Sequence, residues 1–131
     1  MRRLTLDVRP EVYAVAGMAA GAVVPPVLTD PNADGLVSIT RTATELSIVC
    51  PESLVPQGVS VDGRWRLLSV RGPLAFTLTG IIAALSSELA AAGVAIFSIS
   101  TFDTDHVLVK SDDLARATDA LRAAGHVVES G

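Results

Sequence analysis

The stretch Val94–Val109, VAIFSISTFDTDHVLV, decides the fold of this 131-residue chain. It contains two runs rich in β-branched and aromatic residues, 94–100 and 105–109, and the polar corner Thr101–Thr104 lies between them. Such runs favour strands, and a short polar segment that joins two of them predicts a β-hairpin. A long apolar helical pattern precedes the hairpin and a shorter amphipathic one follows it, which indicates an α+β module built around the hairpin.

The segment before the hairpin predicts a strand and then a helix. Residues 65–71 form the strand, which Gly72-Pro73 ends. Thr77 or Thr79 can cap the start of the helix, and Gly93 can end it in a left-handed conformation. The apolar residues between these signals recur at helical spacing and form one stripe, which comprises Leu78, Ile81, Ile82, Leu85 and Leu89.

The segment after the hairpin predicts a second helix and a last strand. Ser111 or Asp112 caps this helix, Gly125 ends it, and residues 126–129 form the strand. The buried face of the helix comprises Leu114, Ala117, Thr118 and Leu121. From Arg64 onward the order is therefore β-α-β-β-α-β. That order predicts a ferredoxin-like module, with both helices on one face of a four-stranded antiparallel sheet.

The N-terminal half predicts strands and little helix. Pro10 is expected to turn the chain between the first two strands, and the Pro- and Gly-rich segment 21–35 leaves room for one helical turn around Pro26–Thr29. The four expected strands are 4–8, 12–18, 36–41 and 45–50. This half resembles a degenerate copy of the same module, in which proline-rich turns replace the helices. The fold class is thus α+β with two ferredoxin-like modules, a degenerate, helix-poor one over 1–60 and a complete one over 61–131.

Composition narrows the possible functions. Half of the residues are hydrophobic and the net charge is −4, so the chain can form a full core and lacks the clustered cations of a nucleic-acid-binding protein. The lone Cys50 provides neither a disulfide framework nor a thiolate metal site. The apolar segment 80–99 is as long as a membrane span, but polar residues at its centre and Gly93 divide it into a helix and a strand. We therefore expect no membrane association and a cytoplasmic location.

Three motifs carry a resemblance to a known family. They are ELSIVCPE (45–52), GPLAFTLTG (72–80) and ISTFDTDHVLVK (99–110). The second, with the helix and strand after it, resembles the ACT domain, the small-molecule regulatory module of aspartate kinase. All three together resemble the stand-alone tandem ACT proteins related to the cellular arginine sensors (the CASTOR-like family). Such sequences often have Tyr after the position of Asp105, whereas this chain has His106, and this difference leaves the identity of the ligand open.

The resemblance implies a non-catalytic regulatory protein that needs no cofactor, binds an effector such as an amino acid between ACT modules, and acts on a downstream protein partner. Carried over by position, one half of the ligand site comprises Gly72, Leu74, Phe76, Thr79, Gly80 and Ile81. The other half comprises Ser100, Thr101, Asp103, Thr104 and Asp105. We expect the end of the first module strand and the hairpin corner to lie at opposite ends of one module, so that a shared site requires a second module. That module is either the other half of this chain or part of a second copy. We expect a homodimer, because the N-terminal half is too reduced to supply a complete site.

The chemistry of the corner leaves alternatives open. The carboxylate of Asp105 or Asp103 can pair with the ammonium group of an amino acid, and it can equally form the local hydrogen bonds common in turns. The Asp-x-Asp pair lacks further metal ligands close by in the sequence apart from His106, and no nucleophile–base set can be assembled. The alternative function is an interaction or dimerisation module with no ligand. A polar cavity between the 72–81 segment and the 100–105 corner would discriminate between the two.

Overall fold

The computed structural model describes residues 3–72 and 80–130. Contacts between Cα atoms divide the chain into two units. The first unit comprises the described residues up to Pro10 together with those from Arg66 onward, and the second comprises Glu11–Trp65. Strands β1 and β4 each contribute one part to either unit, and each unit is described by itself below.

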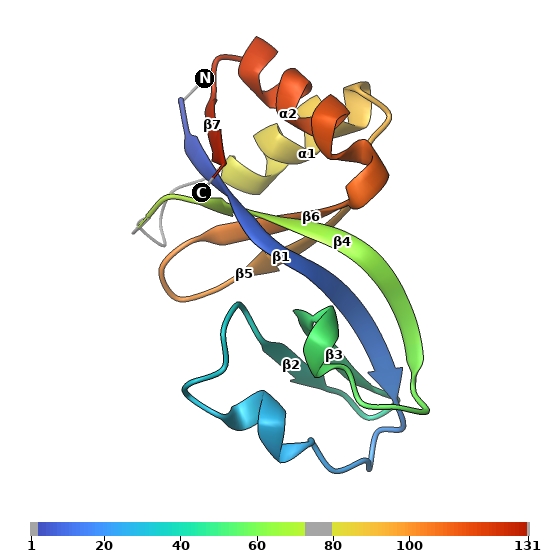
Figure 1. Cartoon of the computed structure of the whole chain (residues 1–131). Coiled ribbons are helices and arrows are strands. Elements are labelled where there is room, and N and C mark those ends of the chain that lie inside the picture. The colour runs from blue at the N-terminus through green and yellow to red at the C-terminus, as the bar shows by residue number, and fades with distance from the viewer. Residues whose placement is uncertain (1–2, 73–79, 131) are drawn as a thin grey trace. The chain divides into compact units, whose positions relative to one another are not determined.

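The first unit confirms the predicted β-α-β-β-α-β order (Figure 1). Strands β5 and β6 form the predicted hairpin, with Ser100 opposite Asp105 at its corner. The elements are β4 (Ser60–Val70, in this unit from Arg66), α1 (Ile81–Ala91), β5 (Ile96–Ser100), β6 (Asp105–Lys110), a 3-10 turn (Ser111–Asp113), α2 (Leu114–Ala123) and β7 (Val127–Ser130).

The sheet of this unit contains one more strand than the four expected. Strand β1 (Thr5–Met18) lies between β4 and β7, which gives the order β7-β1-β4-β6-β5. Its residues Thr5–Val8 pair in parallel with Val127–Ser130 of β7. The N-terminal strand was assigned to the other module in the prediction, because a pairing between the two ends of a sequence leaves no local signal.

The turn predicted at Pro10 is wrong, because β1 runs through this residue without a break. Proline removes one backbone hydrogen-bond donor and is excluded only where a neighbouring strand needs that donor. The pairing of β1 with β7 ends at Val8, and its pairing with β3 begins at Tyr13. Pro10 therefore falls in the gap between two partners on that side of the strand.

The core of the first unit lies between the sheet and the two helices. Leu85 and Leu89 of α1 and Ala117 and Leu121 of α2 are completely buried in it. The strands contribute residues at alternating positions, namely Leu6, Val8, Leu68, Val70, Val107 and Val109. The helical stripes predicted from the sequence are confirmed over the described residues; Leu78, Thr77 and Thr79 lie outside them.

The helix ends differ in part from the prediction. Helix α1 begins after Gly80, which has a φ of 83°, and Gly93, with a φ of 75°, follows its end in the predicted left-handed conformation. Ser111 and Asp112 do not occupy the N-cap of α2, because they belong to a 3-10 turn, Ser111–Asp113, and Asp113 is the residue that precedes the helix. Among the described residues, no helix combines the length and apolar character needed to span a bilayer.

The second unit contains parts of β1 and β4, the strands β2 (Ser38–Arg41) and β3 (Leu46–Pro51), and 3-10 turns at Pro26–Thr29 and Glu52–Leu54. β3 pairs antiparallel with β1 and with β2. The predicted helical turn at Pro26–Thr29 is confirmed, and its Leu28 is buried in a small core with Leu46 and Ile48.

Candidate functional site

The end of β4 and the β5–β6 corner meet within the first unit. The hydroxyl of Thr104 donates a 2.7 Å hydrogen bond to the backbone carbonyl of Val70. The expectation that these two segments lie at opposite ends of a module is therefore wrong. The crossover through α1 makes β5 run in the same direction as β4, with β6 between them, so both strands end at the same edge of the sheet.

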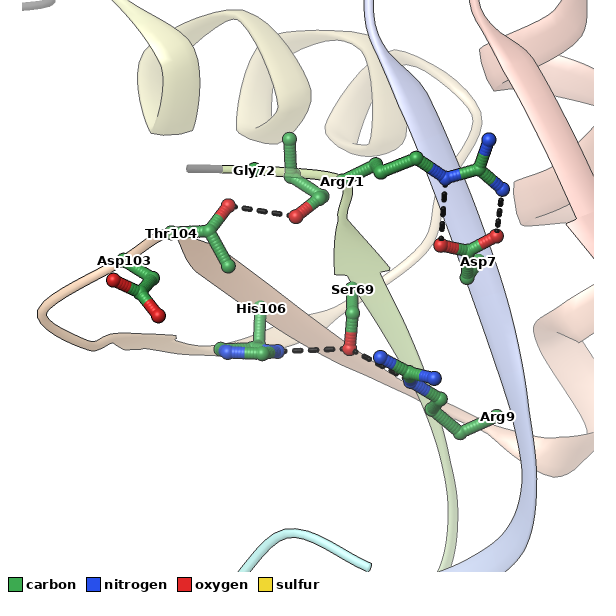
Figure 2. Close-up of a pocket in the computed structure, with 9 residues that line it drawn as sticks. Asp7, Arg9, Ser69, Arg71, Gly72, Asp103, Thr104 and His106 are labelled. Atoms are coloured by element: carbon green, nitrogen blue, oxygen red, sulfur yellow. Dashed lines mark hydrogen bonds and ion pairs between the residues drawn. The ribbon is translucent and has the colours of Figure 1, made fainter. Parts of the chain in front are cut away.

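A cavity of about 260 Å³ opens at this edge, and we call it the groove (Figure 2). Strand β1, the end of β4, the corner and the start of β6 all contribute to its wall. The lining residues are Asp7, Arg9, Ser69, Val70, Arg71, Gly72, Asp103, Thr104 and His106. The volume suits a molecule of amino-acid size, being slightly below the range of drug-sized pockets, about 300–1,000 Å³.

The polar lining follows from the alternation of side chains along the strands. Leu6 and Val8 of β1, and Leu68 of β4, point into the core beneath the helices. Asp7 and Ser69, the neighbours of these residues, consequently point to the opposite face of the sheet. One face of each strand thus builds the core and the other builds the groove.

One side of the groove is held by an ion-pair network. The Arg71 guanidinium donates hydrogen bonds of 2.5 and 3.2 Å to the carboxylate of Asp7 and one of 2.9 Å to Glu129. The hydrogen bonds from Arg71 hold the pKa of the Asp7 carboxyl below its usual range, and the two carboxylates raise the pKa of Arg71. The charges of Asp7 and Arg71 are thus matched to each other within the protein.

Ser69 connects two further groups of the groove. Its Oγ lies 2.8 Å from Nδ1 of His106 and accepts a 3.4 Å hydrogen bond from Nε of Arg9. Figure 2 shows this chain of three side chains running across β6, β4 and β1. Burial lowers the pKa of His106, and the positive charge of Arg9 lowers it further, while Asp105 acts in the opposite direction. His106 is therefore a neutral imidazole at pH 7.

The groove also contains two charges without an ionic partner. Among the described residues, Arg9 forms no ion pair, and its side chain bonds only to the Ser69 hydroxyl. The carboxylate of Asp103 accepts no hydrogen bond from the described part of the chain. The groove thus offers one cation on β1 and one anion on the corner to any molecule that enters it.

The structure brings together only part of the predicted site. Gly72, Asp103 and Thr104 line the groove. Asp105 does not: it accepts a 2.6 Å hydrogen bond from the Ser100 hydroxyl. The backbone N–H of Thr101 bonds to the carbonyl of Thr104 within the corner. Gly80 is exposed, and Ile81 is buried in the core. The remaining predicted residues, Leu74, Phe76 and Thr79, lie outside the described residues.

Six lining residues are absent from the site predicted from the sequence, namely Asp7, Arg9, Ser69, Val70, Arg71 and His106. A usable signal was present in β1 and β4, where polar residues alternate with core residues. Such alternation commonly marks a solvated face, so it points to a site only when the pairing of distant strands is known. Within residues 3–72 and 80–130 no group of three or more His, Cys, Asp or Glu is placed to hold a metal ion.

The sequence and the fold of this chain match those of known proteins. The model of the ACT domain family matches residues 60–123, and a model for an N-terminal domain family matches residues 11–58. A crystal structure of an Agobacterium tumefaciens protein is 41% identical, with a TM-score of 0.90 over 100% of this chain and 96% of the other. The regulatory subunit of aspartate kinase from Thermus thermophilus, 11% identical, shares the fold with a TM-score of 0.66 over 95% and 97% of the two chains.

Curated relatives match part of this chain. The human "cytosolic arginine sensor for mTORC1 subunit 1" is 39% identical over 90 residues, which are 68% of this chain and 27% of the sensor. The rat sensor is 41% identical over the same share of each chain. The chain thus spans about a quarter of the length of the curated relatives it matches. The ACT fold, the family models and these identities together show that this chain belongs to the ACT-domain family, as a protein similar to the cytosolic arginine sensors.

Proposed function

We propose that this chain is a regulatory protein that binds a free amino acid in the groove of its first unit. The observation that carries the proposal is the pair of unpartnered charges, Arg9 and Asp103, which line one cavity. An α-amino acid at neutral pH presents a carboxylate and an ammonium group, so Arg9 pairs with the first and Asp103 with the second. Charge-assisted hydrogen bonds of this kind fix the orientation of a small ligand.

The polar lining favours this function over an interaction module without a ligand. The groove holds five charged or titratable side chains at a position where a pure pairing surface would be apolar. The relatives named as arginine sensors make L-arginine the first ligand to test. The proposal further includes a non-catalytic role that needs no cofactor, a cytoplasmic location and an unidentified downstream protein that distinguishes the bound from the free state.

Two finer parts of the proposal concern assembly. We infer that residues 11–58 are a reduced ACT-like module, because they form a helix-poor sheet with their own small core. A homodimer is also proposed, although Gly72 from one half of the predicted site and Thr104 from the other line the same groove within one chain. Sedimentation velocity across a range of concentrations tests it, with a monomer throughout as the contradicting result.

Calorimetric titration with each of the twenty amino acids tests the ligand. We expect at least one to bind, and Arg9→Gln or Asp103→Asn to weaken it by about tenfold or more, since each removes one charge-assisted contact. Asp119→Asn, an exposed carboxylate on α2, is the matched control and should leave the affinity unchanged. Failure of all twenty to bind, or an Asp103→Asn variant with wild-type affinity, overturns the proposal.

A further inference from the structure

The groove contains a titratable group beside its unpartnered cation. Ser69 Oγ lies within hydrogen-bond distance of both His106 Nδ1 and Arg9 Nε, so the imidazole and the guanidinium share one hydroxyl. Ser69 itself is buried, with 3% of its surface exposed, so the shared hydroxyl belongs to the wall of the groove. An anion that binds Arg9 therefore arrives next to the ring of His106.

The charges around His106 decide its response to such an anion. The groove also contains Arg9 and Asp7 from β1, Arg71 from β4 and Asp103 from the corner. Arg71 is already paired with Asp7, and Ile99, which stands opposite His106 on β5, is uncharged. Without a ligand, the burial of the ring and the positive charge of Arg9 favour the neutral imidazole, while Asp105, beside it on β6, acts in the opposite direction.

We propose that His106 takes up a proton when the carboxylate of a ligand binds beside Arg9, so that the groove binds its ligand more tightly as the pH falls. This inference rests on the proposed function and adds a regulation of the same site. The bound carboxylate cancels the repulsion from Arg9 and supplies an anion that stabilises the imidazolium. Ligand binding and proton binding then support each other, because coupling between two sites is reciprocal.

The sign of the pH dependence follows from this coupling. Binding raises the pKa of His106, so the affinity is highest below the pKa of the free protein and falls as the pH rises through the pKa of the complex. Above that second pKa the affinity becomes constant. A rise of one pKa unit corresponds to a change of about tenfold in affinity between the two limits.

The chain has only two histidines, which makes a direct measurement possible. NMR titration of the His106 Hε1 signal, with and without saturating L-arginine, gives its pKa in the free and bound states. A second titration uses 100 mM sodium acetate, which supplies the carboxylate without the ammonium group. The signal of His126, which is bonded to Leu4 and Glu88 outside the groove, is the internal control.

We expect both ligands to raise the pKa of His106, by about one unit for L-arginine, and to leave the His126 signal unchanged. Arg9→Gln should abolish the effect of acetate and raise the pKa of His106 in the free protein. Saturable binding of L-arginine without a change at His106 overturns this inference and leaves the proposed function intact. Absence of binding by L-arginine, acetate and the remaining amino acids overturns both.

Discussion

Thr104 donates its hydroxyl proton to the backbone carbonyl of Val70, and this 2.7 Å hydrogen bond fixes the β5–β6 corner against the end of β4. The partners are 34 residues apart in the sequence. The bond brings Asp103, on the corner, to the cavity that also contains Arg9. The position of Asp103 relative to Arg9 therefore depends on a hydrogen bond in which neither residue takes part.

Replacing Thr104 with Val tests the hydrogen bond to Val70, because valine keeps the shape of the side chain and removes the hydroxyl. We expect a loss of about 1 kcal/mol in the free energy of unfolding, measured by urea denaturation, and weaker amino-acid binding. The control is Thr101→Val, whose exposed hydroxyl bonds only within the corner. If the two substitutions have equal effects on stability and on binding, the hydrogen bond to Val70 contributes no more than the local bond of Thr101, which contradicts the prediction.

The ion pair between Asp7 and Arg71 makes a pH-dependent contribution to stability. The pKa of Asp7 lies below the usual 3.8 because Arg71 donates hydrogen bonds to its carboxylate. The contribution is present above that usual value and is lost as the pH falls through the lowered pKa. Wild type should therefore be more stable than Asp7→Asn at pH 7, and the difference should narrow towards pH 2. A constant difference over this range contradicts the assignment, and Asp119→Asn is the control.

His126 joins three segments of the first unit in one buried contact. Its Nδ1 accepts a 3.0 Å hydrogen bond from the Leu4 N–H, so the ring proton lies on Nε2, which is 2.9 Å from the Glu88 carboxylate. Nitrogen-15 chemical shifts at pH 7 should show the Nε2–H tautomer. His126→Ala should lower the free energy of unfolding by about 2–4 kcal/mol, because the Leu4 donor and the Glu88 acceptor both lose their partner.

A second variant separates this contact from a loss of packing. Glu88→Gln keeps a carbonyl oxygen that can accept from Nε2, so it should cost less than His126→Ala. Hydrogen exchange at the Leu4 amide should accelerate in His126→Ala and stay slow in Glu88→Gln. Fast exchange in wild type would remove the basis for this prediction.

Two glycines of the second unit have the same backbone conformation but different surroundings. Gly35, with a φ of 88°, would place a Cβ 2.8 Å from Pro51 Cγ and 2.9 Å from the Tyr13 hydroxyl. Gly58, with a φ of 79°, has no such neighbour within 4 Å. Gly58→Ala should therefore cost about 1 kcal/mol for its backbone alone. Gly35→Ala should cost more by thermal denaturation, since it also displaces the Tyr13 hydroxyl that accepts the Leu36 N–H.

The sequence predicted the parts of the fold that depend on local periodicity. The stripe through Leu85 and Leu89, the hairpin and the glycine after α1 all follow from residues close together in the chain. The path of β1 could not be predicted in this way. β1 continues through Pro10 because neither β7 nor β3 pairs with it at that residue. Its position beside β7 depends on residues more than 100 positions away in the sequence.

The candidate site shows the same limit. The corner residue Asp103 follows from the family resemblance and lies in a polar turn, whereas no local motif marks Arg9. Arg9 reaches the groove only because β1 pairs beside β4. Asp105, which the sequence analysis offered beside Asp103, accepts a hydrogen bond from Ser100 instead. The groove combines residues of β1, the end of β4 and the β5–β6 segment, so its charges can be predicted only when the order of the strands in the sheet is known.

The insertion of β1 between β4 and β7 also orders events in time. During synthesis β1 leaves the ribosome before β7, which covers its edge and follows about 120 residues later in the chain. Until β7 arrives, β1 presents an unpaired edge to other chains. A nascent chain that stalls after α2 and before β7 would therefore be prone to aggregate, a risk that the folded protein does not reveal.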